Sequence, residues 1–359
     1  MRGASAAYWR VMAGGRQQGA AERLIQLVLL PAALIYGMIL RLRAAAYRRG
    51  ILPTRRLPRP VVSIGNITVG GTGKTPVTAL VARFLLEHGV KVVVLSRGYS
   101  GALEGKAAVV SDGRRILLTA AECGDEPFLL ASTVPGLSVV IGADRYAAGQ
   151  LALQTCRPDL FLLDDGFQHL QLHRDLNILL LDAARPFGNG WCLPAGLLRE
   201  PKRAAGRADL VVMTRCRPGE SPVSPLPEKP WCRARHEPGE LVPLTERAPL
   251  RLEDLHGRKV AAFCGIAEPD SFFASLHSRG LDLTATHVFR DHESYGPERL
   301  AELETFIAAS GAEYVLTTEK DGVKLGHLAS QYAARILMTR LIITLDDPTP
   351  LHRLLCNFL

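Results

Sequence analysis

The segment from Val61 to Pro76 reads VVSIGNITVGGTGKTP, and it constrains the fold more than any other part of the sequence. A short apolar, β-branched run precedes a glycine-rich loop, and a helical pattern begins directly after this loop. This order of strand, loop and helix is the context that a phosphate-binding P-loop requires. The sequence therefore predicts a nucleotide-binding site, formed by Thr68, Val69, Gly70, Gly71, Thr72, Gly73, Lys74 and Thr75.

Each residue type in this loop has a chemical reason to be there. Glycine adopts backbone angles that are closed to other residues, so successive N–H groups can converge on phosphate oxygens. The N-terminus of the following helix adds a favourable dipole. Lys74 can reach the β- and γ-phosphates of a nucleotide, and the Thr75 hydroxyl can ligate Mg²⁺. Thr68 stands where the strict pattern has glycine, and the alternative is a glycine-rich turn that only resembles a P-loop.

A second motif, at residues 159–166, is an apolar strand that ends in two carboxylates, Asp164 and Asp165. In P-loop enzymes an acid at the end of such a strand binds Mg²⁺ directly or through water. Alone, Asp-Asp-Gly is as often a turn, but an upstream P-loop favours the magnesium site. Gln168 and His169 follow closely and could face the same site, or they could be ordinary polar groups of a loop.

Candidate groups for acid–base chemistry lie in two further segments. Asp125 and Glu126 occupy a turn that leads into a helical pattern, where Asp125 could instead cap the helix. His292, in the run Arg290-Asp291-His292-Glu293, follows a strand-like segment and would alone indicate a polar loop. A kinase needs a base, or a group that orients the attacking hydroxyl, and a carboxylate paired with a histidine from another domain would supply one.

The segment from Phe187 to Pro201 is rich in glycine and proline and ends in Arg199 and Glu200. It is most simply a surface loop, although its length and apolar content also suit the wall of a substrate site.

The N-terminal region combines positive charge with an apolar stretch. Residues 1–60 contain eleven arginines and one acid, a net charge of +10, whereas the rest of the chain sums to −2. Leu24–Leu40 would span about 25 Å as a helix, against about 30 Å of bilayer hydrocarbon. Three alternatives stay open: a spanning anchor, a helix lying in the cytosolic leaflet, and a buried core helix. The flanking arginines favour a membrane surface, because they attract anionic headgroups.

Beyond Pro60, apolar strand patterns alternate with helix-length segments. This alternation predicts an α/β fold: a P-loop NTPase-like, mostly parallel sheet with helices on both faces. We expect a second, smaller α/β domain and an N-terminal membrane-associated helix. The expected boundaries are residues 1–50 for the basic apolar helix, 51–216 for the P-loop kinase domain, 217–250 for a proline-rich linker or irregular excursion, and 251–359 for the C-terminal domain.

Together these residues resemble the tetraacyldisaccharide 4′-kinases, the lipid A 4′-kinase family of Gram-negative bacteria. The resemblance covers nearly the whole chain, and its motifs are long. Ser or Thr is the usual residue of this family at the Thr68 position. The chain departs from the family only locally, at Glu268 and Leu197, where Asn and Pro are common. The motifs are SIGNITVGGTGKTP, LSRGYSG (95–101), GDEP (124–127), ADR (143–145), DDGFQHLQLHRDLNILLLDA (164–183), GNGWCLPAGLLREP (188–201), the Asp291-His292 pair and VLTTEKDGVKL (315–325).

The resemblance implies ATP-dependent phosphorylation of the 4′-hydroxyl of a tetraacylated glucosamine disaccharide 1-phosphate. It implies Asp125 as the base, oriented or tuned by His292, and Lys74, Thr75 and Asp165 as contacts of ATP and Mg²⁺, with Asp164 and Gln168 nearby. It also implies a protein on the cytoplasmic face of the inner membrane, monotopic or held by a single N-terminal helix. The supporting or substrate-contacting residues would be Tyr99, Glu126, Arg145, His169, Arg199 and Glu200.

Two rival functions follow from the same P-loop. One is a membrane-recruited ATPase or GTPase switch protein, in which the nucleotide state would control partner binding. The other, a nucleic-acid-dependent ATPase, is disfavoured because the body of the chain is near neutral. We therefore expect a lipid A precursor and a membrane surface as partners, with no nucleic acid and no obligate protein partner. Acceptor dependence of the turnover distinguishes the kinase from the switch.

Overall fold

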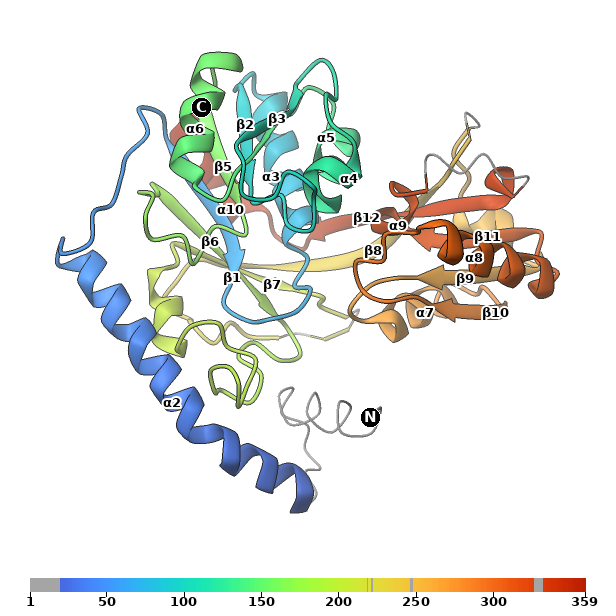
Figure 1. The fold of residues 1–359 in the computed structure, drawn as a ribbon, viewed down its shortest axis with the longest axis horizontal. Coiled ribbons are helices and arrows are strands. Elements are labelled where there is room, and N and C mark those ends of the chain that lie inside the picture. Colours follow the sequence, from blue (N-terminus) through green and yellow to red (C-terminus); the bar gives the residue numbers. More distant parts are fainter. Residues whose placement is uncertain (1–19, 218, 221, 246–247, 326–331) are drawn as a thin grey trace. The chain divides into compact units, whose positions relative to one another are not determined.

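The computed structural model describes residues 20–217, 219–220, 222–245, 248–325 and 332–359, which form two compact units (Figure 1). Unit 1 comprises the described residues of Met1–Leu95, Arg145–Arg235 and Leu345–Leu359. Unit 2 comprises those of Ser96–Asp144 and His236–Thr344. Because the chain enters unit 2 twice, the units interleave in sequence, whereas the expected domains are contiguous segments.

Unit 1 is built on a parallel sheet of buried strands in the order β8-β7-β6-β1-β5-β2. The strands read as nearly continuous apolar runs because a parallel sheet is covered on both faces. They are β1 (Val61–Asn66), β2 (Val92–Ser96), β5 (Leu160–Asp164), β6 (Leu176–Asp182), β7 (Leu210–Thr214) and the first part of β8 (Trp231–Pro243). The helices are α2 (Ala20–Arg48), α3 (Lys74–Glu87), α6 (Arg145–Thr155) and α10 (Thr349–Leu355), with 3₁₀ turns at Lys202–Arg207 and Cys356–Phe358.

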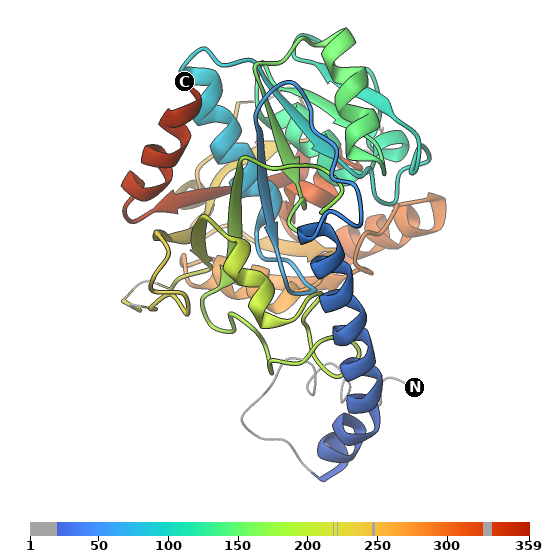
Figure 2. The ribbon, with the colours of Figure 1, turned by 90° about the vertical axis from the view of Figure 1, so that its left-hand side faces the viewer.

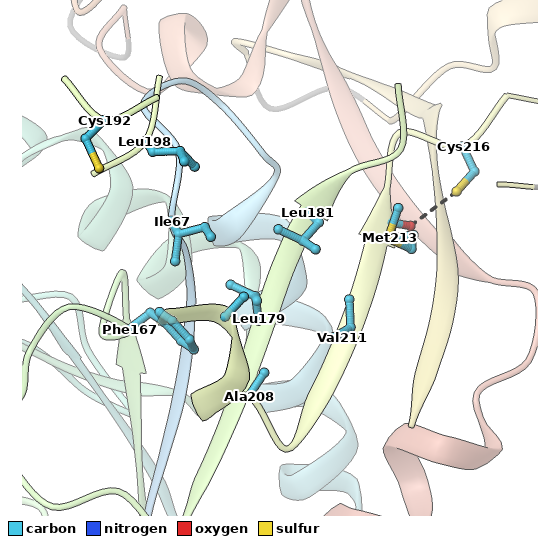
Figure 3. Packing of buried hydrophobic residues seen from close by; sticks show 11 residues of the cluster. Ile67, Phe167, Leu179, Leu181, Cys192, Leu198, Ala208, Val211, Met213 and Cys216 are labelled. Atoms are coloured by element: carbon cyan, nitrogen blue, oxygen red, sulfur yellow. Dashed lines mark hydrogen bonds between the residues drawn. The ribbon is translucent and has the colours of Figure 1, made fainter. Parts of the chain in front are cut away.

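A buried cluster in unit 1 joins the sheet to the loops at its carboxyl edge (Figure 3). Leu179, Leu181 and Val211 come from β6 and β7, and Ile67 and Phe167 come from the segments directly after β1 and β5. These side chains are at most 1% exposed, so the loops that carry the candidate site residues are packed against the core. Cys192, Leu198, Ala205, Ala208, Met213 and Cys216 complete the cluster.

Unit 2 holds a second parallel sheet in the order β10-β9-β11-β12 and an antiparallel pair, β3 and β4. The strands are β3 (Ala108–Asp112), β4 (Ser138–Ile141), β9 (Val260–Cys264), β10 (Leu283–Val288), β11 (Tyr314–Thr318) and β12 (Ile336–Leu345), and the second part of β8 belongs to this unit. The helices are α4 (Ala120–Cys123), α5 (Asp125–Thr133), α7 (Pro269–His277), α8 (Pro297–Ser310) and α9 (Glu319–Gly322), with 3₁₀ turns at Leu252–Leu255 and Ala333–Arg335.

These elements confirm the predicted fold class, a mostly parallel α/β sheet with a P-loop between β1 and α3. The expectation of an irregular excursion at residues 217–250 is wrong for β8, which continues through Pro238 and Gly239. Proline and glycine weaken a strand pattern because they remove a ladder donor and a packing side chain. Here β7 pairs with Trp231–Arg233, ahead of both residues, so the proline does not interrupt that ladder.

Helix α2 is long and apolar, and Figure 2 shows it as one continuous helix that leads to β1. By length and composition its Arg23–Arg48 portion could cross a membrane, which is weak support for membrane association. Leu27, Val28 and Leu42 are each at least 64% exposed, so α2 is not a buried core helix. It contacts the rest of unit 1 through Tyr36, whose hydroxyl donates to the carbonyl of Arg199 (3.4 Å).

Candidate active site

The P-loop lies at the carboxyl end of β1, where open α/β sheets bind their ligands. Gly73 adopts a left-handed conformation (φ 78°) and forms the N-cap of α3 without a side-chain cap. The first N–H groups of α3 are therefore oriented as anion donors, and Lys74 is the first residue of the helix. Thr72 and Thr75 are buried beside it, at 4% exposure each. The structure thus shows the predicted order of strand, loop and helix, and nucleotide binding by this loop stays a prediction.

Asp165 lies directly after β5 and pairs with two cations of unit 1. Its Oδ2 accepts from Arg199 Nη1 at 2.8 Å and lies 3.9 Å from Lys74 Nζ. Burial opposes ionisation of this carboxyl, but Lys74, Arg199 and Arg145 outweigh it and hold the pKa of Asp165 below its ordinary value. Asp165 also has a positive φ of 52°, which is strained for a non-glycine residue and is typical of functional positions.

The oxygen atoms around Asp165 fit a magnesium ion. Oδ1 of Asp165 is buried and has no hydrogen-bond partner in the described part of the chain, and Thr75 lies on the first turn of α3. Asp164 is 1% exposed and accepts from the Thr78 hydroxyl at 2.9 Å. Among the described residues, no group of three or more His, Cys, Asp or Glu side chains is arranged to hold a metal ion by itself.

Gln168 and His169 lie in the loop after Asp165, at the same edge of the sheet. The Gln168 amide donates to the carbonyl of Asn66 (2.5 Å), at the end of β1. The carbonyl of His169 accepts from Arg174 Nη1 at 3.2 Å. Arg174 also donates to the carbonyl of Phe167 (3.3 Å), so one guanidinium holds the backbone of this loop.

The Phe187–Pro201 segment is hydrogen-bonded to the entry of the P-loop. Arg199 N donates to the carbonyl of Ile67 (2.7 Å), and Val69 N donates to the carbonyl of Leu197 (2.8 Å). This backbone pairing places the Arg199 side chain on Asp165. These contacts place the end of the segment beside the P-loop, and its expected role as the wall of a substrate site stays a prediction.

Glu200 supports this site indirectly, through Arg207. It is 4% exposed and accepts two hydrogen bonds from Arg207, at 2.8 and 3.1 Å. Arg207 in turn donates to the carbonyl of Phe167 (3.2 Å) and lies over its ring. Glu200 thus supports the loop that follows Asp165. Sequence reasoning missed Arg207, because nothing in the sequence pairs it with Phe167.

A second group of candidate residues lies in unit 2, around Asp125. Helix α5 begins at Asp125 with Gly124 as its N-cap, so the alternative that Asp125 caps the helix is wrong. Gly124 has a φ of 90°, and a Cβ there would meet the carbonyl of Tyr99 at 2.5 Å. Only glycine fits this close approach, which brings Asp125 to the loop that carries Tyr99.

His292 and Lys324 both contact the Asp125 carboxylate. His292 Nδ1 lies 3.3 Å and Lys324 Nζ 3.1 Å from the same oxygen, Oδ2. Burial opposes ionisation of Asp125, but the hydrogen bond with His292 and the charge of Lys324 hold its pKa below the ordinary value. The hydrogen bond with Asp125 raises the pKa of His292 against the effect of burial. The carboxylate and the histidine are therefore in contact, but the prediction that they come from different domains is wrong, because both belong to unit 2.

The remaining predicted residues of this group are close by. The ring of Tyr99 meets the ring of His292 edge-on, with centroids 5.9 Å apart. Glu126 pairs with Lys320 at 2.6 Å. Sequence reasoning missed Lys320 and Lys324, although both lie in the VLTTEKDGVKL motif. Their position just after the carboxyl end of β11 is the signal that could have found them.

The P-loop between β1 and α3, with acids at the end of the neighbouring strand β5, defines a P-loop nucleotide-binding fold. A family model described as tetraacyldisaccharide-1-P 4′-kinase (LpxK) matches residues 25–359. The tetraacyldisaccharide 4′-kinase of Pelobacter propionicus is 56% identical over 360 residues, covering 100% of this chain and 99% of the relative. That of Geobacter sulfurreducens is 53% identical over 350 residues, with 96% and 97% covered.

A crystal structure of LpxK from Aquifex aeolicus in complex with ATP superposes with a TM-score of 0.79. The two chains are 34% identical, and the match covers 93% of this chain and 99% of the Aquifex chain. The chain belongs to the tetraacyldisaccharide-1-P 4′-kinase family, the lipid A 4′-kinases. It is an enzyme of this family, and the switch-protein alternative is not favoured.

Proposed function

We propose that this enzyme transfers the γ-phosphoryl group of ATP to the 4′-hydroxyl of a tetraacylated glucosamine disaccharide 1-phosphate. The observation that carries the proposal is the arrangement of unit 1, in which the P-loop lysine, Lys74, lies at the start of α3 beside Asp165. Family membership supports the acceptor, because its relatives are tetraacyldisaccharide 4′-kinases.

In this proposal the loop from Thr68 to Thr75 holds the ATP phosphates through its backbone N–H groups. Lys74 stabilises the charge on the transferred group, and Thr75, Asp165 and Asp164 hold Mg²⁺, with Gln168 nearby. When bound, Mg²⁺ neutralises phosphate charge. Lys74, Arg199 and Arg145 favour the ionised form of Asp165 and lower its pKa.

At the acceptor, Asp125 is the base and His292 orients it. The O–H bond of the acceptor breaks as its oxygen bonds to the γ-phosphorus, the proton passes to Asp125, and ADP leaves with the bridging electrons. Phosphoryl transfer proceeds through a loose transition state, so a well-positioned carboxylate suffices even when its pKa is low. Tyr99, Glu126 and Lys320 surround this pair and support its position.

We also propose that α2 rests in the cytoplasmic leaflet of the inner membrane, where a multiply acylated acceptor resides. Its exposed apolar side chains and its basic C-terminal part support this location. Replacing the exposed Arg41 and Arg48 by glutamine should weaken binding to anionic vesicles, by about 1 kcal/mol per arginine. Flotation at low and high salt measures this effect. Unchanged, salt-insensitive binding would instead indicate a spanning helix.

The experiment that tests the function is transfer of labelled phosphate from ATP to a tetraacyldisaccharide 1-phosphate in detergent micelles. We expect a labelled lipid product and turnover that depends on the acceptor. ATP hydrolysis at the same rate without lipid, with no labelled lipid, would favour the switch protein and overturn the proposal. A hydroxyl-bearing lipid without the disaccharide serves as the acceptor control.

A further inference from the structure

Lys324 is a buried cation whose place in unit 2 no sequence motif assigned. Its side chain is 7% exposed, and its Nζ lies between two carboxylates, 3.1 Å from Asp125 Oδ2 and 3.7 Å from Asp321 Oδ1. Burying an ammonium group costs free energy unless a carboxylate pairs with it. The contacts of Asp321 and Asp125 indicate which of the two carboxylates needs Lys324 as its partner.

Asp321 has its own set of hydrogen-bond donors. It is fully buried and accepts from the backbone N–H of Gly265 (2.9 Å), the hydroxyl of Thr318 (2.7 Å) and the hydroxyl of Tyr295 (3.0 Å). Burial, and then the charge of Asp321, raise the pKa of Tyr295, so its hydroxyl stays a donor. Three donors satisfy Asp321 without Lys324.

The same residues fix the position of Lys324. Asp321 lies three residues before it, and its Nζ lies over the ring of Tyr295, 5.5 Å from the centroid. His292, the other partner of Asp125, is hydrogen-bonded to the same network, because its backbone N–H donates to the carbonyl of Gly265 at 3.3 Å. Asp321 and Tyr295 therefore direct Lys324 toward its closer partner, Asp125.

The two cations use only one oxygen of Asp125. His292 and Lys324 both contact Oδ2, and Oδ1 has no partner among the residues that the structure describes. We propose that Lys324 is a positioning residue that, with His292, holds Oδ2 of Asp125 so that Oδ1 accepts the proton of the attacking hydroxyl. This inference rests on the proposed function, in which Asp125 is the base.

The two carboxylate oxygens of Asp125 have different roles in the proton transfer. The acceptor O–H bond breaks, its proton moves to Oδ1, and the acceptor oxygen bonds to phosphorus while ADP departs. Oδ2 remains bound to the two cations throughout, and the proton on Oδ1 passes to water after the product leaves. Without Lys324, Asp125 would titrate closer to neutral pH and could rotate. The titratable and charged groups that face Asp125 and its partners are His292, Asp291, Lys320, Lys324, Asp321, Glu126, Cys123 and Tyr295.

The test compares Lys324→Met and Lys324→Gln with Lys259→Met in the full-length enzyme. Lys259 is an exposed lysine just before β9, and serves as the matched control. We measure kcat, both KM values and the pH profile of kcat/KM for the lipid, from about pH 5 to about pH 9. Lys324→Gln removes the charge but keeps a polar side chain of similar length at this buried position, so it keeps the proposal testable even if Lys324→Met fails to fold.

We expect both Lys324 variants to lower kcat by about 100-fold, the scale of acid–base catalysis, with little change in the KM for ATP. The acidic limb of the profile should move up by about 1 to 2 pH units, because an adjacent cation lowers a carboxyl pKa by that amount. Lys324→Arg, which restores the charge, should return the limb toward its wild-type position, and Lys259→Met should match the wild type.

An acidic limb that stays in place in Lys324→Gln would overturn the inference, as would a rise in the KM for ATP without loss of kcat. Asp125→Asn, measured alongside, separates this failure from that of the proposed function. If Asp125→Asn retains wild-type kcat, Asp125 is not the base and the proposed function fails there. If Asp125→Asn loses kcat while the limb of Lys324→Gln does not move, only the role of Lys324 is wrong.

Discussion

Asp165 in unit 1 and Asp125 in unit 2 are both aspartates held by two cations, yet they differ in what holds them. The side chain of Asp165 is 31% exposed and that of Asp125 is 12% exposed. Asp165 follows its strand directly, whereas Asp125 begins a helix and is contacted by Lys324, which is buried and fixed by Asp321. In both, positive charge outweighs burial and lowers the pKa.

This difference separates two kinds of carboxylate. Oδ1 of Asp165 is buried and has no hydrogen-bond partner among the described residues, and Oδ2 of the same carboxylate lies near Lys74, an arrangement that can accept a metal ion and a nucleotide. The Oδ2 of Asp125 has two partners within unit 2, His292 and Lys324, so its pairing does not depend on a bound ligand. We infer that Asp165 serves the phosphoryl donor and Asp125 the acceptor, and the following predictions can contradict or refine this division.

The largest effect is expected from Lys74→Ala. Removing the main cation of the P-loop should lower kcat by about 1,000-fold or more, because the charge of the transition state loses its stabilisation. The fold should be intact by circular dichroism. Lys91→Ala, an exposed lysine before β2, is the matched control and should behave as the wild type. Near wild-type turnover of Lys74→Ala would show that the P-loop assignment is wrong.

Asp125→Asn should lower kcat by about 100- to 1,000-fold while the KM for ATP changes little, because the amide cannot accept the proton. Steady-state kinetics with each substrate varied in turn measures this split. If the variant instead raises only the KM for ATP, Asp125 belongs to the nucleotide half, and the proposed contrast with Asp165 is lost.

Glu200→Gln should act on stability more than on chemistry. It breaks the buried pair with Arg207, which supports the loop after Asp165, so we expect a loss of about 1 to 3 kcal/mol in the free energy of unfolding. Denaturant unfolding measures the loss. Glu220→Gln removes the exposed partner of Arg217 in the same unit and should change nothing. Equal stability of the two variants would contradict the support that we assign to Glu200.

The smallest effect is a pH dependence of stability from His292. The hydrogen bond with Asp125 raises the pKa of His292 above its ordinary value of 6.5. The stabilisation of the folded state by the protonated His292 is therefore fully present below pH 6.5. It is lost as the pH rises through the raised pKa. The difference in Tm between wild type and His292→Gln should therefore shrink as the pH increases above neutral. A constant difference would mean that His292 does not titrate against Asp125.

Local sequence was enough to predict the elements that form the proposed nucleotide half of the site. The run from β1 through Gly73 to α3 carries its own strand, turn and helix signals, and Asp164 and Asp165 end an apolar strand. Each of these signals acts over a few residues, so the sequence alone identifies them. The structure places Arg199 beside Asp165, where only tertiary pairing with the P-loop strand could put it.

The proposed acceptor half could be predicted only in part. Asp125 and His292 were identified through the family resemblance, but Lys324 was not, because 199 positions separate it from Asp125 and nothing local connects them. The sequence also did not predict that Ser96–Asp144 belongs to unit 2, because strand patterns do not indicate which sheet a strand joins. Strand β8 was missed because Pro238 and Gly239 mask its pattern.

The division of labour between the two aspartates is tested most directly by equilibrium binding of ATP at increasing Mg²⁺ concentrations. The measurement compares wild type, Asp165→Asn and Asp125→Asn by calorimetry in the absence of lipid. We predict that Asp165→Asn loses the Mg²⁺-dependent part of the ATP affinity, by about 10-fold or more, while Asp125→Asn binds as the wild type. Equal weakening in both variants, or weakening in Asp125→Asn alone, would contradict the account.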